Sequence, residues 1–398
     1  MTFLQEYGSY WSVFAGTLLF FLLGFWFRRT ALHAAELTPK PLDWVRNYRS
    51  GCYPFGKERF GLLKLSIGLF VALFASAGFA IYASFMVSKI LKLEFSFFSN
   101  YYSFSIILRT LGAGAVYLLL QLLLRSPRVA LPGALLFAAS SVRGHNDACL
   151  FALSLLLLLL YLRSSVPGFL GELLYLSACL AFSAVLALRP ALIWLLLCFP
   201  AAHWYKLRWM LREGRLSWKQ SLGFTAAALA IWALVVLLAM LLHFFLLNGF
   251  RLQFLLNVLR RTSLRLVSRD WFSTLQTTVL RSPTRGMVLE LLLDAPLLGF
   301  GFWGCFSACR LGIQRRNVQG LLILILFAAL ILIWLLNSVY LLTFPLTLCT
   351  ACFLREADLG QKRWICVTAA AAGLCWYLIV LYSASAAPLT AGLLERIR

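Results

Sequence analysis

The chain has 398 residues, of which 62% are hydrophobic and only 13% are charged. A soluble domain carries roughly 25% charged residues and must cover its surface with polar groups, so this composition excludes a soluble globular protein. The net charge of +22 would suggest a nucleic-acid partner if the protein were soluble. Here the basic residues gather in short loops between apolar runs, as the positive-inside rule describes. Nucleic acid is therefore not an expected partner.

Apolar runs divide the chain into membrane spans, because a span needs about 20 apolar residues. The sequence predicts an all-α, polytopic transmembrane helical bundle with about 10–12 spans, in one domain over 1–398. The clear candidate spans are 10–27, 62–90, 103–124, 148–162, 168–187, 221–248, 286–308, 320–337, 339–354 and 363–388. Two shorter runs, 129–142 and 191–205, fit either re-entrant segments or crossings extended by their flanks. The N-terminus lacks the features of a signal peptide, so the first run is expected to be a retained span.

A group of polar residues directly precedes the span that begins at 148, in the run SSVRGHNDACLFALSLLLLLLYLRS at 140–164. The group consists of Arg143, His145, Asn146 and Asp147. Two spans later, Arg189 returns to the same side of the membrane. Ionisable groups at membrane depth are costly and need partners or water, so these residues together predict a polar pocket. The alternative is that Asn146 or Asp147 caps the following helix, which does not account for the whole group.

Basic loops set the expected orientation of the bundle. Five basic residues face one acid in the loop 203–220, and two further basic loops contain Arg310, Arg315 and Arg316, and Arg355, Lys362 and Arg363. We expect all three loops on the cytoplasmic side. The predicted pocket and the stretch 249–285 then face outside.

The stretch 249–285 includes the run RLQFLLNVLRRTSLRLVSRDWFSTLQ, which carries five arginines and a single acid, Asp270, with leucines at three- and four-residue spacing. This pattern predicts an amphipathic helix in the membrane interface. Positive charge on the outer side runs against the positive-inside trend. The segment either rests on anionic headgroups or binds the phosphate of a lipid carrier. The arginines assigned to that second role are Arg260, Arg261, Arg265 and Arg269.

Other polar residues lie in or near the spans. Glu172, Glu290, Asp294 and His243 are expected to be satisfied inside the bundle rather than catalytic. The cysteine pairs at 305 and 309 and at 349 and 352 have no neighbouring histidine, so they predict buried small hydrophobic residues and no metal site.

The order of these features resembles that of a known family. A GHND run, an apolar span, a short turn, a second span and the pair Arg189-Pro190 resemble the polytopic GT-C glycosyltransferases, especially the polyprenyl-phosphate-sugar-dependent mannosyl- and hexosyltransferases of bacteria. The resemblance covers 100–205. It implies a GT-C-like fold, a multi-pass protein of the bacterial plasma membrane, and inverting sugar transfer from a lipid-linked donor to a glycan or lipid acceptor on the outer face. In such an enzyme His145, Asn146, Asp147 and Arg189 would line the donor site. Some relatives use a divalent cation, which leaves such an ion open as a cofactor.

The same resemblance implies a carboxylate base in the first outer loop, where it would deprotonate the acceptor hydroxyl. The polar loop 28–60 contains LDWVRNYRSGCYPFG, which makes Asp43 the expected base. The seven basic residues and three acids of this loop nevertheless favour a cytoplasmic position. Glu94, in the short loop LKLEFSFFSNYY, is the alternative base.

Other classes of protein also fit the sequence. An O-antigen-polymerase- or ligase-like enzyme would use the arginines of 249–285 for a diphosphate-linked substrate. A transporter or flippase of lipid-linked glycan precursors would show matching halves with broken helices, which we do not find in the sequence. A GT-C fold with a non-catalytic scaffolding role is a further alternative.

Overall fold

The computed structural model describes residues 2–35, 62–90, 100–124, 126–140, 145–163, 169–188, 190–212, 214, 216–246, 285–310 and 343–386. Within these ranges every regular element is a helix, which confirms the predicted all-α class. The first half of the chain forms α1 (Thr2–Ala35), α3 (Leu62–Ile90), α4 (Asn100–Leu124), α5 (Pro127–Ala138), α6 (His145–Arg163) and α7 (Phe169–Leu188). A short 3-10 helix, η1 (Pro190–Leu197), is followed by α8 (Cys198–Arg212), α9 (Trp218–Leu246), α12 (Arg285–Cys309), α14 (Thr343–Leu359) and α15 (Arg363–Ala386).

Six of the described helices are long and apolar enough to cross a membrane: α1, α3, α4, α9, α12 and α15. The helices α5, α6 and α7 are apolar but shorter. The candidate span 320–337 lies outside the described residues. The short run 129–142 forms α5, which begins at Pro127 and carries Pro132 inside it. The other short run, 191–205, divides between η1 and α8, and α8 continues past it to Arg212.

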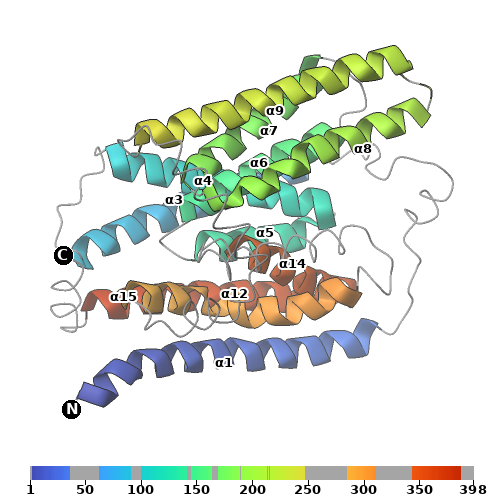
Figure 1. The fold of residues 1–398 in the computed structure, drawn as a ribbon. Coiled ribbons are helices and arrows are strands. Elements are labelled where there is room, and N and C mark those ends of the chain that lie inside the picture. Colours follow the sequence, from blue (N-terminus) through green and yellow to red (C-terminus); the bar gives the residue numbers. More distant parts are fainter. Residues whose placement is uncertain are drawn as a thin grey trace, which may run out of the picture.

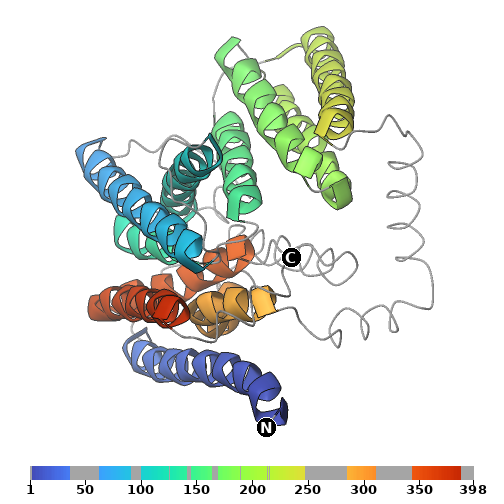
Figure 2. The same cartoon turned by 90° about the vertical axis from the view of Figure 1, so that its left-hand side faces the viewer.

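The helices form a bundle in which α1 lies at one edge and α9 at the other (Figure 1). Helix α1 packs on α12, and α12 packs closely on α14. On the opposite side α6 contacts α4 and α7, and α7 contacts α9 (Figure 2). The central helix α14 is buried over almost its whole length, because α1, α4, α5, α6, α12 and α15 all contact it.

Glycines allow α1, α12 and α14 to approach each other closely. A Cβ on Gly299 would lie 2.6 Å from the backbone carbon of Phe20, and a Cβ on Gly304 would overlap the carbonyl oxygen of Cys349. The indole of Trp303 donates a hydrogen bond of 2.9 Å to the carbonyl of Phe21. Small residues at helix contacts are typical of membrane bundles, where close backbone packing replaces the hydrophobic drive for association.

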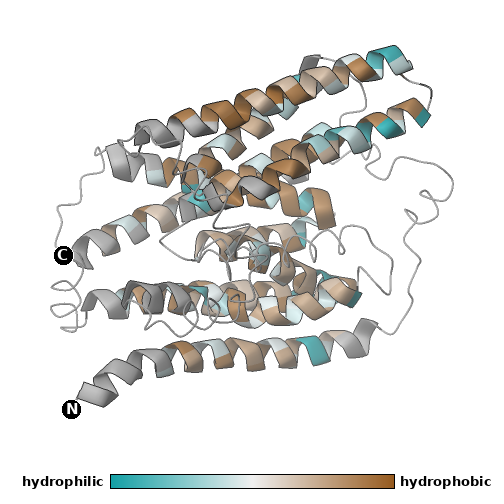
Figure 3. Ribbon diagram, in the orientation of Figure 1, coloured by the Kyte–Doolittle hydropathy of each residue, from teal (hydrophilic) through white to brown (hydrophobic). Residues whose placement is uncertain are grey.

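The helices differ widely in how much of their surface is covered. In the central window of α4, 67% of the residues are buried, whereas in that of α9 only 17% are. The exposed side chains of α9 include Leu222, Leu229, Leu234 and Leu237. Apolar side chains on the outside of a helical bundle are what a lipid environment favours, and Figure 3 shows apolar residues along most of α9.

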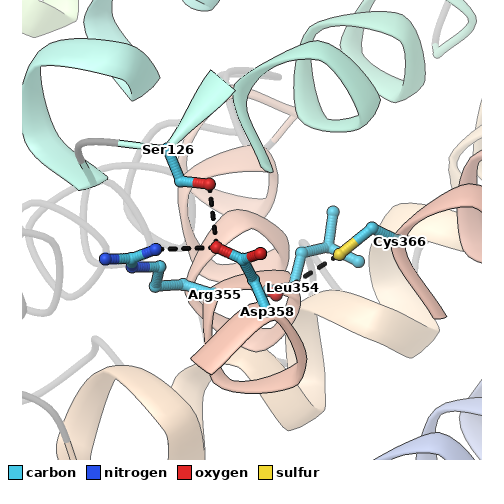
Figure 4. A network of polar contacts seen from close by, with 5 residues as sticks. All are labelled: Ser126, Leu354, Arg355, Asp358 and Cys366. Atoms are coloured by element: carbon cyan, nitrogen blue, oxygen red, sulfur yellow. Dashed lines mark hydrogen bonds and ion pairs between the residues drawn. The ribbon is translucent and has the colours of Figure 1, made fainter. Parts of the chain in front are cut away.

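One end of the bundle carries more basic than acidic residues, with Arg128 at the start of α5, Arg310 directly after α12, Arg355 near the end of α14 and Arg363 at the start of α15. Asp358, near the end of α14, accepts hydrogen bonds from Ser126 at 2.9 Å and from Arg355 at 2.8 Å (Figure 4). Glu356 accepts a hydrogen bond of 2.6 Å from Ser307 and pairs with Arg310 at 3.5 Å. We call this end, where α4, α12 and α14 end and α5 begins, the basic end. Hydrophilic residues also colour the ends of α1, α8 and α12 on this side in Figure 3.

Candidate functional site

The candidate site lies at the end of the bundle opposite the basic end, where α4 and α6 run side by side. Asp147 stands on α6 with 6% of its surface exposed, and Arg109 stands on α4 with 8% exposed. Both side chains act electrostatically on the thiol of Cys149, which lies on α6 two residues after Asp147. Two oppositely charged groups from different helices are therefore buried in one region.

Close packing of α4 on α6 brings these two residues together. Gly112, one turn after Arg109, faces Cys149 so closely that a Cβ on the glycine would overlap the cysteine side chain. Because the two helices run in the same direction here, Arg109 and Asp147 lie at the same level of the bundle. Helix α6 begins at His145, so Asp147 lies in its first turn, where the unpaired N–H groups favour a negative charge.

A third and a fourth helix also reach this region. Arg109 acts electrostatically on Tyr377 of α15. The hydroxyl of Tyr377 donates a hydrogen bond of 3.5 Å to the carbonyl of Phe79 on α3, and the two rings meet edge to face with centroids 5.7 Å apart. The site is therefore built where α3, α4, α6 and α15 converge.

Of the residues that the sequence singles out, the structure describes a minority. Asp147 is buried in the first turn of α6, and His145 and Asn146 contribute their backbone to the same helical turn. The remaining predicted site residues lie outside the described residues: Arg143, Arg189, Asp43, Glu94, Arg260, Arg261, Arg265 and Arg269.

The helix ends that flank Asp43 nevertheless lie at one end of the bundle, and the helix ends that flank Glu94 lie at the other. Phe27, near the end of α1, packs on Trp364 at the basic end, and Gly68, near the start of α3, faces Tyr117 in the second half of α4. The helix ends that flank Asp43 therefore lie at the basic end. Helix α3 ends and α4 begins on the side of Asp147, so the ends that flank Glu94 lie at the candidate site.

Arg109 is a site residue that the sequence reasoning missed. It lies in the run FSIILRTLGAG, inside a predicted span with no other charge. The signal was present, because an ionisable residue inside a membrane segment is by default a functional candidate.

Glu172 was expected to be satisfied inside the bundle rather than catalytic. Lys206 acts electrostatically on it, but its Oε2 atom is buried without a hydrogen-bond partner. The cysteines agree with the prediction in part. Cys349 and Cys352 are fully buried, whereas Cys305 and Cys309 are half-buried, and the sulfurs of Cys305 and Cys349 lie 3.7 Å apart. Among the described residues no three His, Cys, Asp or Glu side chains form a group that could hold a metal ion.

Comparison of the chain with protein-family models, curated proteins and solved structures gives no match. The class of protein is therefore defined by its architecture, a helical bundle with six helices long and apolar enough to span a membrane, and the site is interpreted from its geometry.

Proposed function

We propose that the protein is an integral membrane glycosyltransferase of the GT-C type, which transfers a sugar from a polyprenyl-phosphate carrier to an acceptor on the outer face of the bacterial plasma membrane. The observation that carries the proposal is the burial of Asp147 and Arg109 in one region at the end of the bundle away from the basic end. Charges at membrane depth are costly and mark substrate sites. The basic end suits the cytoplasmic side, which leaves Asp147 and Arg109 for the outer side.

Each residue has a role in this reaction. The guanidinium of Arg109 binds the phosphate of the carrier, because a planar fork of N–H donors matches phosphate oxygens. The carboxylate of Asp147 accepts hydrogen bonds from sugar hydroxyls. Glu94 takes the proton of the acceptor hydroxyl as the new glycosidic bond forms and the carrier phosphate leaves. The flanking helix ends favour Glu94 over Asp43 in that role.

Binding and transfer provide the test. The purified chain is reconstituted in lipid, and its affinity for a short-chain polyprenyl phosphate is measured for wild type, Arg109→Gln and Arg109→Lys. Loss of a hydrogen-bonded charge costs about 1.5–3 kcal/mol, so Arg109→Gln should weaken binding by about tenfold or more. Arg109→Lys should retain part of the affinity. Arg128→Gln, an exposed arginine at the basic end, is the matched control.

Asp147→Asn separates binding from transfer. The variant should still bind the polyprenyl phosphate, but it should lose sugar transfer from membranes that contain the lipid-linked donor. Unchanged affinity in Arg109→Gln, in a variant that unfolds at the same temperature as wild type, would overturn the proposed site. A variant that loses ATP-independent passage of the lipid-linked donor across the bilayer, and not transfer, would indicate the transporter class instead.

A further inference from the structure

Arg28 lies near the end of α1 with its guanidinium against aromatic side chains of α12. Its Cζ atom is 5.3 Å from the centre of the Trp303 ring and 5.5 Å from the centre of the Phe306 ring. Both separations are typical of cation–π contacts, which extend to about 6 Å. The guanidinium is therefore held at a defined place where the two helices meet, and we call this place the Arg28 site.

The ring that holds Arg28 is itself fixed by the packing of α1 on α12. The indole of Trp303 donates a hydrogen bond of 2.9 Å to the carbonyl of Phe21. The same ring lies against Gly24, where a Cβ would come within 2.8 Å of it. Phe306 follows one turn later, and its ring centre lies 5.7 Å from that of Trp303. A site that is formed before its ligand arrives loses less entropy on binding.

The positive charge of Arg28 has no acidic partner in the part of the chain that the structure describes. Its Nε atom is buried without a hydrogen-bond partner, whereas its two Nη atoms are not enclosed in this way. Two acids lie on α14, which packs beside α12, but Glu356 pairs with Arg310 and Asp358 pairs with Arg355. A charged group at the edge of a membrane bundle needs a partner or water, so the Arg28 site is open to an anion.

Helices α1 and α12 run in the same direction, toward the basic end. Phe20 faces Gly299, and eight residues later Arg28 faces Phe306, seven residues after Gly299. Arg28 therefore lies where the contact between the two helices reaches the basic end. Figure 3 shows hydrophilic residues near this end of α1, after a long stretch that is mostly apolar.

Aromatic side chains beside Arg28 are exposed on the outside of the bundle. Phe25 of α1 is 48% exposed, and Phe302 and Phe306 of α12 are each 47% exposed. Because α1 lies at the edge of the bundle (Figure 1), these rings face the surrounding membrane. Phe25 and Phe302 lie one turn closer to the membrane interior than Arg28 and Phe306. A cation at the rim thus adjoins an apolar surface that continues into the bilayer.

The chemistry of this surface identifies the class of ligand. A guanidinium presents a planar fork of donors that matches the oxygens of a phosphate group. The apolar rings below it suit an acyl chain rather than a water-soluble anion. Because the charge of Arg28 is not compensated, a headgroup with a net negative charge fits better than a zwitterionic one. Basic pockets between helices on the cytoplasmic side of a membrane are typical sites for such lipids.

We propose that the Arg28 site binds an anionic phospholipid, whose phosphate accepts hydrogen bonds from the Nη groups of Arg28 and whose acyl chain covers Phe25, Phe302 and Phe306. The lipid contacts both α1 and α12 and stabilises their packing. It lies at the end of the bundle opposite Asp147, so it is distinct from the carrier lipid assigned to Arg109.

Native mass spectrometry of the full chain in detergent tests the proposal. The protein is titrated with phosphatidylglycerol, and the dissociation constant of the first bound lipid is measured for wild type and three variants. Arg28→Gln should weaken binding by about tenfold or more, because a charge-assisted hydrogen bond is lost. Arg28→Lys keeps the charge without the planar fork and should bind with intermediate affinity. Arg29→Gln is the matched control, since Arg29 is the next residue and is exposed; it should change the affinity by less than about threefold.

Thermal unfolding separates binding from folding. Arg28→Gln also loses its ring contacts, so the quantity compared is the rise in unfolding temperature that phosphatidylglycerol causes within each protein. Wild type and Arg29→Gln should show this rise, and Arg28→Gln should not. Phosphatidylcholine, which has acyl chains without net charge, and glycerol phosphate, which has the phosphate without chains, should not reproduce it. Equal affinity of wild type and Arg28→Gln for the first phosphatidylglycerol, or an equal rise with either control compound, would show that the proposal is wrong.

Discussion

Substitution of Arg310 by glutamine should destabilise the bundle, because it removes the ion pair of Arg310 with the buried Glu356. The Glu356 side chain is 5% exposed. One of its oxygens accepts a hydrogen bond of 2.6 Å from Ser307, and the other forms an ion pair with Arg310 at 3.5 Å. Breaking a fully buried pair costs about 3–5 kcal/mol. Arg310 is 28% exposed at a longer distance, so water compensates part of the loss and we expect about 1–2 kcal/mol.

A double-mutant cycle isolates this interaction. Glu356→Gln keeps an oxygen that accepts the Ser307 hydrogen bond, and it removes the buried charge. In that background Arg310→Gln should cost less than about 0.5 kcal/mol, which leaves a coupling energy of about 1–2 kcal/mol. The chain has buried free cysteines, so a thiol-reactive dye reports unfolding of the four proteins in denaturant. An equal cost of Arg310→Gln in both backgrounds would show that the pair contributes nothing, and the reasoning from burial would then be refuted.

Two further predictions concern packing and pH. Gly304→Val should lower the yield and the unfolding temperature of the folded protein by pushing α12 away from α14. A Cβ at this position meets the backbone of α14, which a rotamer change cannot relieve. Gly78→Ala is the control, because a Cβ at Gly78 meets no other atom, and it should leave both quantities unchanged. Because the pKa of Lys206 is lowered from 10.5 to about 8, the unfolded chain binds more protons between these values. Stability should therefore rise with pH in this window, by at most about 3 kcal/mol. The double variant Lys206→Met/Glu172→Gln should lack that part of the rise in a denaturant titration.

The sequence predicts where helices lie better than which of their faces meet. The bounds of α3 agree with the predicted span 62–90 because a long apolar run has only one way to satisfy its backbone in lipid. Hydropathy does not distinguish α4 from α9, although one is mostly buried and the other mostly exposed. In a membrane both surroundings are apolar, so the periodicity that reveals a buried face in a soluble helix is weak here.

The candidate site shows the same limit. A charged residue beside an apolar span is visible in the sequence, and Asp147 was identified in this way. Asp147 lies close to Arg109 because α4 and α6 approach each other closely at Gly112. No local sequence pattern predicts that contact. Lys206 was counted as part of a basic loop, because the turns of α8 beyond residue 205 are too polar to read as a span. Only the packing of α8 on α6 shows that the side chain points inward.

The contact between α1 and α12 has a consequence for how the protein is made. Trp303 reaches the carbonyl of Phe21, a partner 282 residues earlier in the chain. At roughly 5–20 residues per second, synthesis of the intervening chain takes about 15–60 s. During that time α1 has neither α12 nor α14 beside it. Helix α1 is therefore synthesised long before the helices against which it packs. Until the C-terminal helices are synthesised, the glycines and aromatic residues of α1 are exposed to lipid or to the insertion machinery.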